Sequence, residues 1–270
     1  MRKSYLKYYL EKTYLAPIKF LGDYFLEQEP RKRLALWNRL KDYVEILMTR
    51  GDGGKVLEFH HEINQILLEQ SNRFPHYDYG EGYFYQDFPE ALISGFRDTA
   101  SRVDRLGLME LVRNKSVLDV GCNAGFLLLH LAGSCEYGFG FDVNPFLVKI
   151  ANATKSFRSI KNINFSTTAF EELELESSYD VCLSLANHST YDKNTKQDVE
   201  SYFAKIALAL DDTGLLVFES HPPAIEDKDK LNKTIIAIEK YFNIKEIKLL
   251  PFSGFLDRDR TYILATKSSY

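Results

Sequence analysis

The chain has 270 residues, of which 45% are hydrophobic and 27% charged, so it is long enough to bury a sizeable core. Its formal net charge is −4 and no long run of lysine and arginine is present, which argues against a dedicated nucleic-acid binder. The three cysteines, Cys122, Cys135 and Cys182, are odd in number and widely spaced, which argues against a disulfide framework or a zinc site, and we expect no bound metal.

The first part of the chain predicts helices. Apolar residues recur at helical spacing over 35–48 and 56–70, with a glycine-rich break at 51–54. The aromatic stretch 71–98 carries Gly and Pro and predicts a loop or short-helix lid, and 99–112 predicts another helix. We therefore predict a helical cap or lid over residues 1–94, which also offers the surface for a homodimer.

No membrane attachment is expected from the sequence. The chain begins MRKSYLKYYLEK, which lacks the apolar core of a signal peptide, and no apolar run approaches the ~20 residues of a membrane span. We expect a cytoplasmic protein.

From Lys115 onward, strand-like and helix-like segments alternate. Apolar strands are predicted at 116–120, 137–143, 163–169, 179–186, 213–220, 244–250 and 261–267, with helices that begin at 126, 145, 198 and 228. Apolar strands that alternate with helices indicate a parallel sheet covered on both faces. The sequence thus predicts an α/β domain over residues 95–270, built on a doubly wound, mostly parallel seven-stranded sheet.

The first predicted strand runs into a glycine-containing turn and a helix, in the order Asp-Val-Gly-Cys-Asn-Ala-Gly-Phe from Asp119 to Phe126. Such a turn lets backbone approach a ligand at the carboxyl edge of the sheet. The second strand ends in Asp142, which can accept hydrogen bonds from both hydroxyls of a ribose. The glycine spacing fits neither the dinucleotide fingerprint nor a P-loop, so another nucleoside cofactor is indicated.

Four stretches resemble the class I S-adenosylmethionine-dependent methyltransferases. VLDVGCNAGF is similar to their first motif, with Asn123 at the middle glycine, and GFDVNP resembles the second. YDVCLSLANH and DDTGLLVFE resemble the fourth motif and the strand-five region, so the resemblance covers about Gly95 to the end. It implies methyl transfer with S-adenosyl-L-methionine as cofactor.

The resemblance also implies residue roles. Gly121 and Gly125 would let the main chain pass close to the methionine part, and Asp119 would hold the turn or contact the amino group. Asp142 would bind the ribose, and Asn144 would line the adenine end. The cofactor-binding set predicted in this way is Asp119, Gly121, Cys122, Asn123, Gly125, Asp142, Asn144, Ala169, Phe170 and Arg97.

Three members of that set depend on departures from the family or on weaker analogies. Where the family often carries an acid for the adenine amine, this chain has Ala169 and Phe170, which suggests a backbone contact and apolar packing on the ring. Arg97 would pair with the cofactor carboxylate, with Arg102 behind it, because a guanidinium fork suits a carboxylate. A surface salt bridge is the alternative for that arginine.

The acceptor is expected at the carboxyl ends of the fourth and fifth strands. His188 follows the fourth strand and is the candidate base or acceptor-orienting group, since neutral histidine accepts a proton near pH 7. His221 and Glu219 end the fifth strand and complete the predicted catalytic set. Tyr83, Tyr85, Gln86 and Tyr191 are predicted to form a lid or acceptor wall, unless they only pack the extension on the sheet.

Three functions follow from these features. The leading prediction is O-methylation of a small molecule or glycan. The rival is methylation of RNA or its terminal phosphate, favoured by the upstream arginine segment and the GCNAGF turn. Residues 186–189 read Ala-Asn-His-Ser, which counts against the Asn/Asp-Pro-Pro-aromatic motif of base N-methylation. The third is a non-catalytic, methyltransferase-like protein that binds a partner through its N-terminal helices.

Overall fold

The computed structural model describes residues 30–48, 53–73, 84–174, 178–188, 197–223, 226–250 and 259–268. Within them, the strands form one seven-stranded sheet in the order β3-β2-β1-β4-β5-β7-β6. β7 is antiparallel to both of its neighbours, and the other pairs are parallel. The predicted fold is confirmed. The strands are β1 Ser116–Val120, β2 Tyr137–Asp142, β3 Ile163–Thr167, β4 Tyr179–Leu185, β5 Leu210–Glu219, β6 Phe242–Leu250 and β7 Arg260–Lys267.

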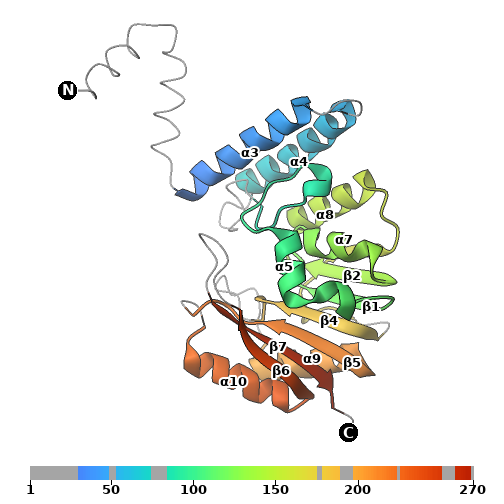
Figure 1. The fold of residues 1–270 in the computed structure, drawn as a ribbon, viewed down its shortest axis with the longest axis vertical. Helices are drawn as coiled ribbons and strands as arrows, with labels where there is room; N and C mark the ends of the chain where they lie inside the picture. The colour runs from blue at the N-terminus through green and yellow to red at the C-terminus, as the bar shows by residue number, and fades with distance from the viewer. Residues whose placement is uncertain are drawn as a thin grey trace, which may run out of the picture.

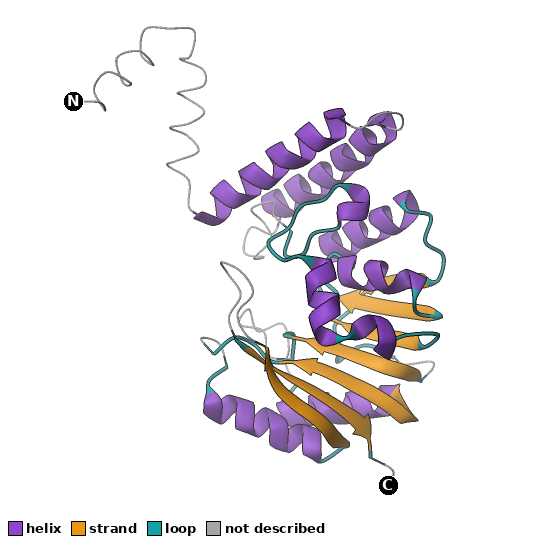
Figure 2. Cartoon of the chain, viewed as in Figure 1, coloured by secondary structure: helices purple, strands orange, loops and turns teal. Residues whose placement is uncertain are grey.

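Helices cover both faces of the sheet (Figure 2). One face carries α5 Thr99–Leu106, α6 Leu108–Leu111, α7 Phe126–His130 and α8 Pro145–Phe157, and the other carries α9 Val199–Ala209 and α10 Lys228–Glu239. Alternate strand residues point to opposite faces, so Val117 joins the first layer and Leu118 the second. The single helix predicted over 99–112 is in fact two, because Gly107 adopts a left-handed φ of 64° and ends α5.

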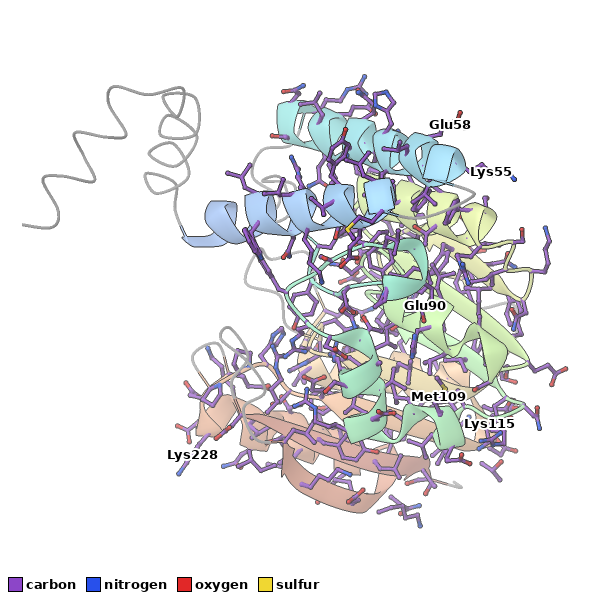
Figure 3. All side chains as sticks on the ribbon, turned by 45° about the horizontal axis from the view of Figure 1, so that its top comes forward. Lys55, Glu58, Glu90, Met109, Lys115 and Lys228 are labelled. Atoms are coloured by element: carbon purple, nitrogen blue, oxygen red, sulfur yellow. The ribbon has the colours of Figure 1, made fainter. Side chains whose placement is uncertain are left out.

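The N-terminal helices are α3 Pro30–Met48 and α4 Gly53–Arg73, so α4 begins within the predicted break at 51–54. α4 lies along α8 (Figure 1), where the Phe59 and Phe157 rings stack with centroids 4.3 Å apart. Lys55 and Glu58 mark the start of α4 (Figure 3). The extension and the sheet therefore share one apolar core.

One side of α3 stays open to solvent. Its exposed apolar side chains are Trp37, Leu40, Tyr43, Val44, Leu47 and Met48. Among the described helices, none combines the length and hydropathy needed to cross a bilayer.

The turn between β1 and α7 packs closely against side chains of β3 and α8. Gly125 caps α7 with a left-handed φ of 72°. A Cβ atom built on it would lie 2.6 Å from the Phe165 ring of β3 and 2.9 Å from the Ala151 Cβ of α8. Both the backbone conformation and the space therefore require glycine.

Gly125→Ala is expected to lower the free energy of unfolding by about 2–4 kcal/mol, since left-handed strain and overpacking combine. Urea denaturation measures the change. Gly133→Ala is the matched control, because that glycine has open space around its Cβ position. Equal stability of the two variants would contradict the predicted crowding of the turn.

Candidate active site

The turn after β1 keeps its shape although asparagine replaces a glycine. Asn123 adopts a left-handed φ of 55°, a conformation that asparagine tolerates better than most residues. Its Oδ1 accepts a hydrogen bond from the Ala124 N–H at 2.8 Å. The Cys122 N–H donates to the Phe141 carbonyl at 2.9 Å, and the Cys122 Cβ lies close to Gly140. The N–H groups of Cys122 through Gly125 are all used within the protein, so these residues could offer a ligand their carbonyl groups.

Asp142 joins this turn to the start of α8. Its Oδ2 accepts the Asn123 N–H at 3.0 Å, and its Oδ1 accepts the Asn144 N–H at 2.9 Å. The carboxylate is half-buried at the carboxyl end of β2. This placement is compatible with the predicted ribose contact.

Asp119 is a buried carboxyl group at the end of β1. Within the described part of the chain it accepts no hydrogen bond, and its residue is 5% exposed. Burial raises the pKa of Asp119 to about 7; Asp142 adds to the rise and Arg102 opposes it. A ligand ammonium group would compensate such a carboxylate. With the glycine turn and Asp142, this residue fits a cofactor that carries both an amino group and an adenosyl group.

Asn187 follows β4 and lies over the same turn, although the sequence did not single it out. Its Oδ1 accepts from the Ser184 hydroxyl at 2.9 Å and from the Tyr202 hydroxyl at 3.1 Å. Its Nδ2 is buried without a partner. A Cβ atom on Gly121 would lie 3.0 Å from that nitrogen, so the glycine allows the close approach.

Two residues expected at the adenine end make contacts within the protein. Asn144 is the N-cap of α8: its Oδ1 accepts from the Phe146 and Leu147 N–H groups, and its Nδ2 donates to Gln70. The side chain is therefore fully engaged.

Phe170, expected on the adenine ring, packs in the core. It is 6% exposed and its ring stacks on Phe141 at 5.7 Å. The Ala169 carbonyl accepts the Glu172 and Leu173 N–H groups, so this carbonyl closes a local turn. Ala169 has no side-chain donor or acceptor to offer a base.

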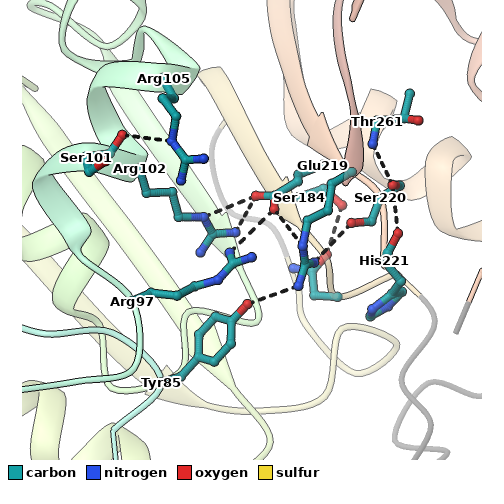
Figure 4. Close-up of polar contacts among 12 residues, drawn as sticks. Tyr85, Arg97, Ser101, Arg102, Arg105, Ser184, Glu219, Ser220, His221 and Thr261 are labelled. Atoms are coloured by element: carbon teal, nitrogen blue, oxygen red, sulfur yellow. Dashed lines mark hydrogen bonds and ion pairs between the residues drawn. The ribbon is translucent and has the colours of Figure 1, made fainter. Parts of the chain in front are cut away.

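Glu219 lies among three arginines (Figure 4). Arg102 contacts its Oε2 through Nε at 3.1 Å and Nη2 at 2.5 Å, while Arg97 and Arg260 approach Oε1 at 3.5 and 3.2 Å. Burial alone would raise the pKa of Glu219, but the arginines outweigh it and hold that pKa at about 2. The structure thus gives Glu219 the role of a fixed anion, which replaces the catalytic role expected from the sequence.

The lid residue Tyr85 belongs to the same cluster. The Arg97 guanidinium lies over its ring at 4.9 Å, and the Tyr85 hydroxyl accepts from Arg260 at 3.3 Å. Arg97 is thus in a buried ion-pair cluster rather than in the surface salt bridge weighed for it. Burial, followed by the neighbouring Arg102, lowers the pKa of Arg97 to about 10.

Of the other predicted lid residues, the structure describes only Gln86. Gln86 is buried, with its Nε2 unpartnered. Tyr83 and Tyr191 lie outside the described residues.

His188 and His221 do come together, with ring centroids 5.1 Å apart. Glu226, which sequence reasoning missed, organises them: its Oε1 contacts the His188 Nε2 at 2.9 Å and its Oε2 accepts the His221 backbone N–H at 3.1 Å. Thr234 of α10 also donates to Glu226, at 2.8 Å. No local spacing links this acid to His188, which precedes it by a strand and a helix.

The two histidines keep one buried nitrogen each without a partner, Nδ1 of His188 and Nε2 of His221. Burial, followed by the adjacent His188, lowers the pKa of His221 to about 4, so this ring is neutral at pH 7. Among the described residues, no group of three His, Cys, Asp or Glu side chains is placed to hold a metal ion. The pair can therefore accept protons or hydrogen bonds from a ligand.

A groove of about 1360 Å³ runs between α4, α8 and the end of β3. It is lined by apolar side chains and by acidic residues of α4, among them Glu58, Glu62 and Glu69. It lies on the flank of the molecule where the helical extension meets the sheet domain. The histidines are not part of its lining.

Comparison with known proteins gives consistent findings. A family model described as a methyltransferase domain matches residues 111–265. The release factor glutamine methyltransferase of Fusobacterium nucleatum is 26% identical over 208 residues, which cover 65% of this chain and 59% of that protein. The chain spans 59% and 42% of the lengths of two curated relatives that it matches.

Solved structures share the fold. The N-methyltransferase NodS from Bradyrhizobium japonicum WM9 superposes with a TM-score of 0.53 at 17% identity, covering 63% of this chain and 96% of NodS. Its complex with S-adenosyl-L-homocysteine gives a TM-score of 0.52 at 16% identity, covering 63% and 87% of the two chains.

Glu219→Gln is expected to lower the free energy of unfolding by about 3–5 kcal/mol, because three buried guanidinium groups lose their anion. Since the pKa of Glu219 is held at about 2, its contribution is present above about pH 4 and is lost on acidification toward pH 2. Chemical denaturation at several pH values tests both statements. Glu110→Gln, at an exposed pair with Arg113, should change stability little, and an equally mild effect at Glu219 would contradict the prediction.

Asp119→Asn is expected to weaken S-adenosylmethionine binding about tenfold or more, since a charge-assisted contact to the ligand amino group is lost. In the absence of cofactor, the same substitution should instead favour the stability of the protein at high pH. Because the pKa of Asp119 is raised to about 7, the wild-type protein loses stability as pH rises from about 4 through about 7, and the asparagine variant does not. Calorimetric titration and thermal unfolding at about pH 5 and about pH 8 measure these effects. If the difference in stability between the wild-type protein and the variant were the same at both pH values, the raised pKa assigned to Asp119 would be refuted.

Proposed function

Because the chain belongs to the S-adenosylmethionine-dependent methyltransferase family, we propose that it methylates an oxygen atom of a small-molecule or glycan acceptor, with His188 as the proton acceptor. The observation that carries the proposal is the His188–Glu226 pair at the end of β4, whose free ring nitrogen is buried and unpartnered.

The chain's own residues would hold the cofactor along the carboxyl edge of β1 and β2. Asp119 receives the amino group, the turn 121–125 supplies backbone, and Asp142 meets the ribose. When bound, S-adenosylmethionine supplies an electrophilic methyl group on a sulfonium. What remains for the protein is to align the acceptor oxygen and to remove its proton.

Glu226 sets the tautomer of His188. Burial alone would raise the pKa of Glu226, but its hydrogen bond with His188 and the other donors lower that pKa, so the carboxylate only accepts. The His188 Nε2 that faces it must therefore carry the hydrogen, and the neutral ring keeps a lone pair on Nδ1. The His188 Nδ1 would be placed to take the proton of an acceptor hydroxyl, whose oxygen would receive the methyl group that the bound cofactor supplies.

His221 would orient the acceptor rather than compete for its proton. Its pKa of about 4 makes it a weak base at pH 7, but its neutral Nε2 can form one hydrogen bond with an acceptor hydroxyl. Phe218 packs edge-on against His188 at 4.9 Å, so the pair has an apolar floor.

A panel of acceptors tests the proposal. S-adenosylhomocysteine release would be followed with hydroxylated small molecules, oligosaccharides, primary amines and RNA transcripts. Turnover with the hydroxylated compounds supports the proposal, and turnover with RNA alone would establish the rival. No binding of S-adenosylmethionine at millimolar concentration would favour the non-catalytic alternative.

Two further expectations remain proposals, a cytoplasmic location and a homodimer. The three cysteines are buried and unpaired, which is compatible with a reducing compartment. The exposed apolar side of α3 supports a dimer. Light scattering of the full chain measures its oligomeric state.

His188→Ala is expected to lower kcat by about 100- to 10,000-fold, the usual contribution of a general base, while the Kd for S-adenosylhomocysteine stays within about twofold. The acceptor that the panel identifies serves as substrate. His61→Ala, an exposed histidine on α4, is the control and should leave both constants unchanged. Parallel losses of kcat and cofactor affinity would make His188 a structural residue.

A further inference from the structure

Gln70 is a polar residue of α4 that is completely buried, with 0% of its surface exposed. It lies near the end of the helix, next to Glu69, which reaches Lys149 of α8 at 3.6 Å. A buried carboxamide normally has a partner for each end. Among the residues that the structure describes, only one end of Gln70 has a partner.

The hydrogen-bond network fixes which end is satisfied. Asn144 uses its Oδ1 to accept two backbone N–H groups at the start of α8, so its Nδ2 must face Gln70. That Nδ2 donates at 3.0 Å to the Gln70 Oε1. The Gln70 Nε2 is therefore a donor, and it is buried without a partner.

The position of this donor points to the cofactor. The Asn144 N–H donates to the Asp142 carboxylate, so Gln70 is two hydrogen-bonded steps from the predicted ribose contact. Along the sheet edge, Asp119 on β1 marks the amino-acid end of the ligand and Asp142 on β2 its ribose. Continuing in the same direction leads to β3. Helix α8 packs against β3 and α4 packs on α8, so we expect the base on this side of the site.

We propose that the Gln70 Nε2 donates a hydrogen bond to a ring nitrogen of the adenine of S-adenosylmethionine. Adenine ring nitrogens are acceptors, as this donor requires, whereas the exocyclic amine is itself a donor. The helical extension thus supplies part of the cofactor site, and α4 reads the base while the sheet holds the rest. The inference depends on cofactor binding and not on which acceptor is methylated.

The test is a double-mutant cycle between Gln70 and the base, measured by calorimetric titration of the full chain. The ligands are S-adenosylhomocysteine and its 1-deaza, 3-deaza and 7-deaza analogues, each of which lacks one ring nitrogen. Gln70→Met removes the donor, whereas Gln70→Glu also removes it but keeps an acceptor for Asn144. Asn64→Met, at an exposed carboxamide of the same helix that does not line the groove between α4 and α8, is the control.

S-adenosylhomocysteine should bind both Gln70 variants about tenfold more weakly, while the control stays at the wild-type affinity. One deaza analogue should lose a similar factor with the wild-type protein and nothing further with the variants. The proposal would be overturned if the affinity losses from the substitution and from the missing ring nitrogen were additive for all three analogues. It would also be overturned if the variants bound S-adenosylhomocysteine as tightly as the wild-type protein. If the methionine variant does not fold, as judged by circular dichroism, the near-isosteric glutamate variant carries the comparison.

The outcomes separate this inference from the proposed acceptor chemistry. An acceptor panel with no oxygen methylation would leave the binding cycle intact. Failure of the wild-type protein to bind S-adenosylhomocysteine would overturn the role of Gln70 together with the cofactor site.

Discussion

The Asp142 carboxylate is the constraint on which the arrangement of the cofactor site depends. It accepts the Asn123 N–H from the turn after β1 and the Asn144 N–H at the start of α8, and so fixes two loops from neighbouring strands against each other. The α8 cap follows from this, because Asn144 can reach the first helical N–H groups only from that position. Through Asn144 the same contact holds Gln70, and with it the end of α4.

The sequence revealed local structure well and long-range partners poorly. Apolar strands alternating with helices predicted the sheet, and Asn123 replaced a motif glycine without changing the backbone because asparagine tolerates a left-handed φ. Motif position, however, places a backbone segment and does not name the partner of its side chain. Asn144 was therefore expected at the adenine end and Glu219 in the catalytic set, and their contacts with Gln70 and Arg102 were not foreseen. Glu226 was missed because nothing in its own neighbourhood connects it to His188.

The end of β5 separates two kinds of chemistry. Phe218 and Glu219 are consecutive, so their side chains leave opposite faces of the sheet. Phe218 lies under the His188 ring, while Glu219 enters the arginine cluster on the α5 face. The arginines therefore contact the Glu219 carboxylate on one face of the sheet. The neutral His221 lies beside His188, which packs on Phe218 of the other face. Two consecutive strand residues thus contact the arginine cluster and the histidine pair on opposite faces of the sheet.

Among the described residues, several buried polar side-chain atoms have no hydrogen-bond partner, and two of them, the Asn187 Nδ2 and the Gln70 Nε2, lie in the region proposed to bind the cofactor. Folded proteins leave few such groups, because each unsatisfied buried group costs about 1–3 kcal/mol. The buried Asp119 carboxylate lies on the strand between β4 and β2, at the end of β1. One extended ligand with a cationic end and hydrogen-bond acceptors could satisfy groups of both kinds. The unfavourable free energy of these unsatisfied groups would then become part of the binding free energy, so that ligand affinity and protein stability are linked through the same three side chains.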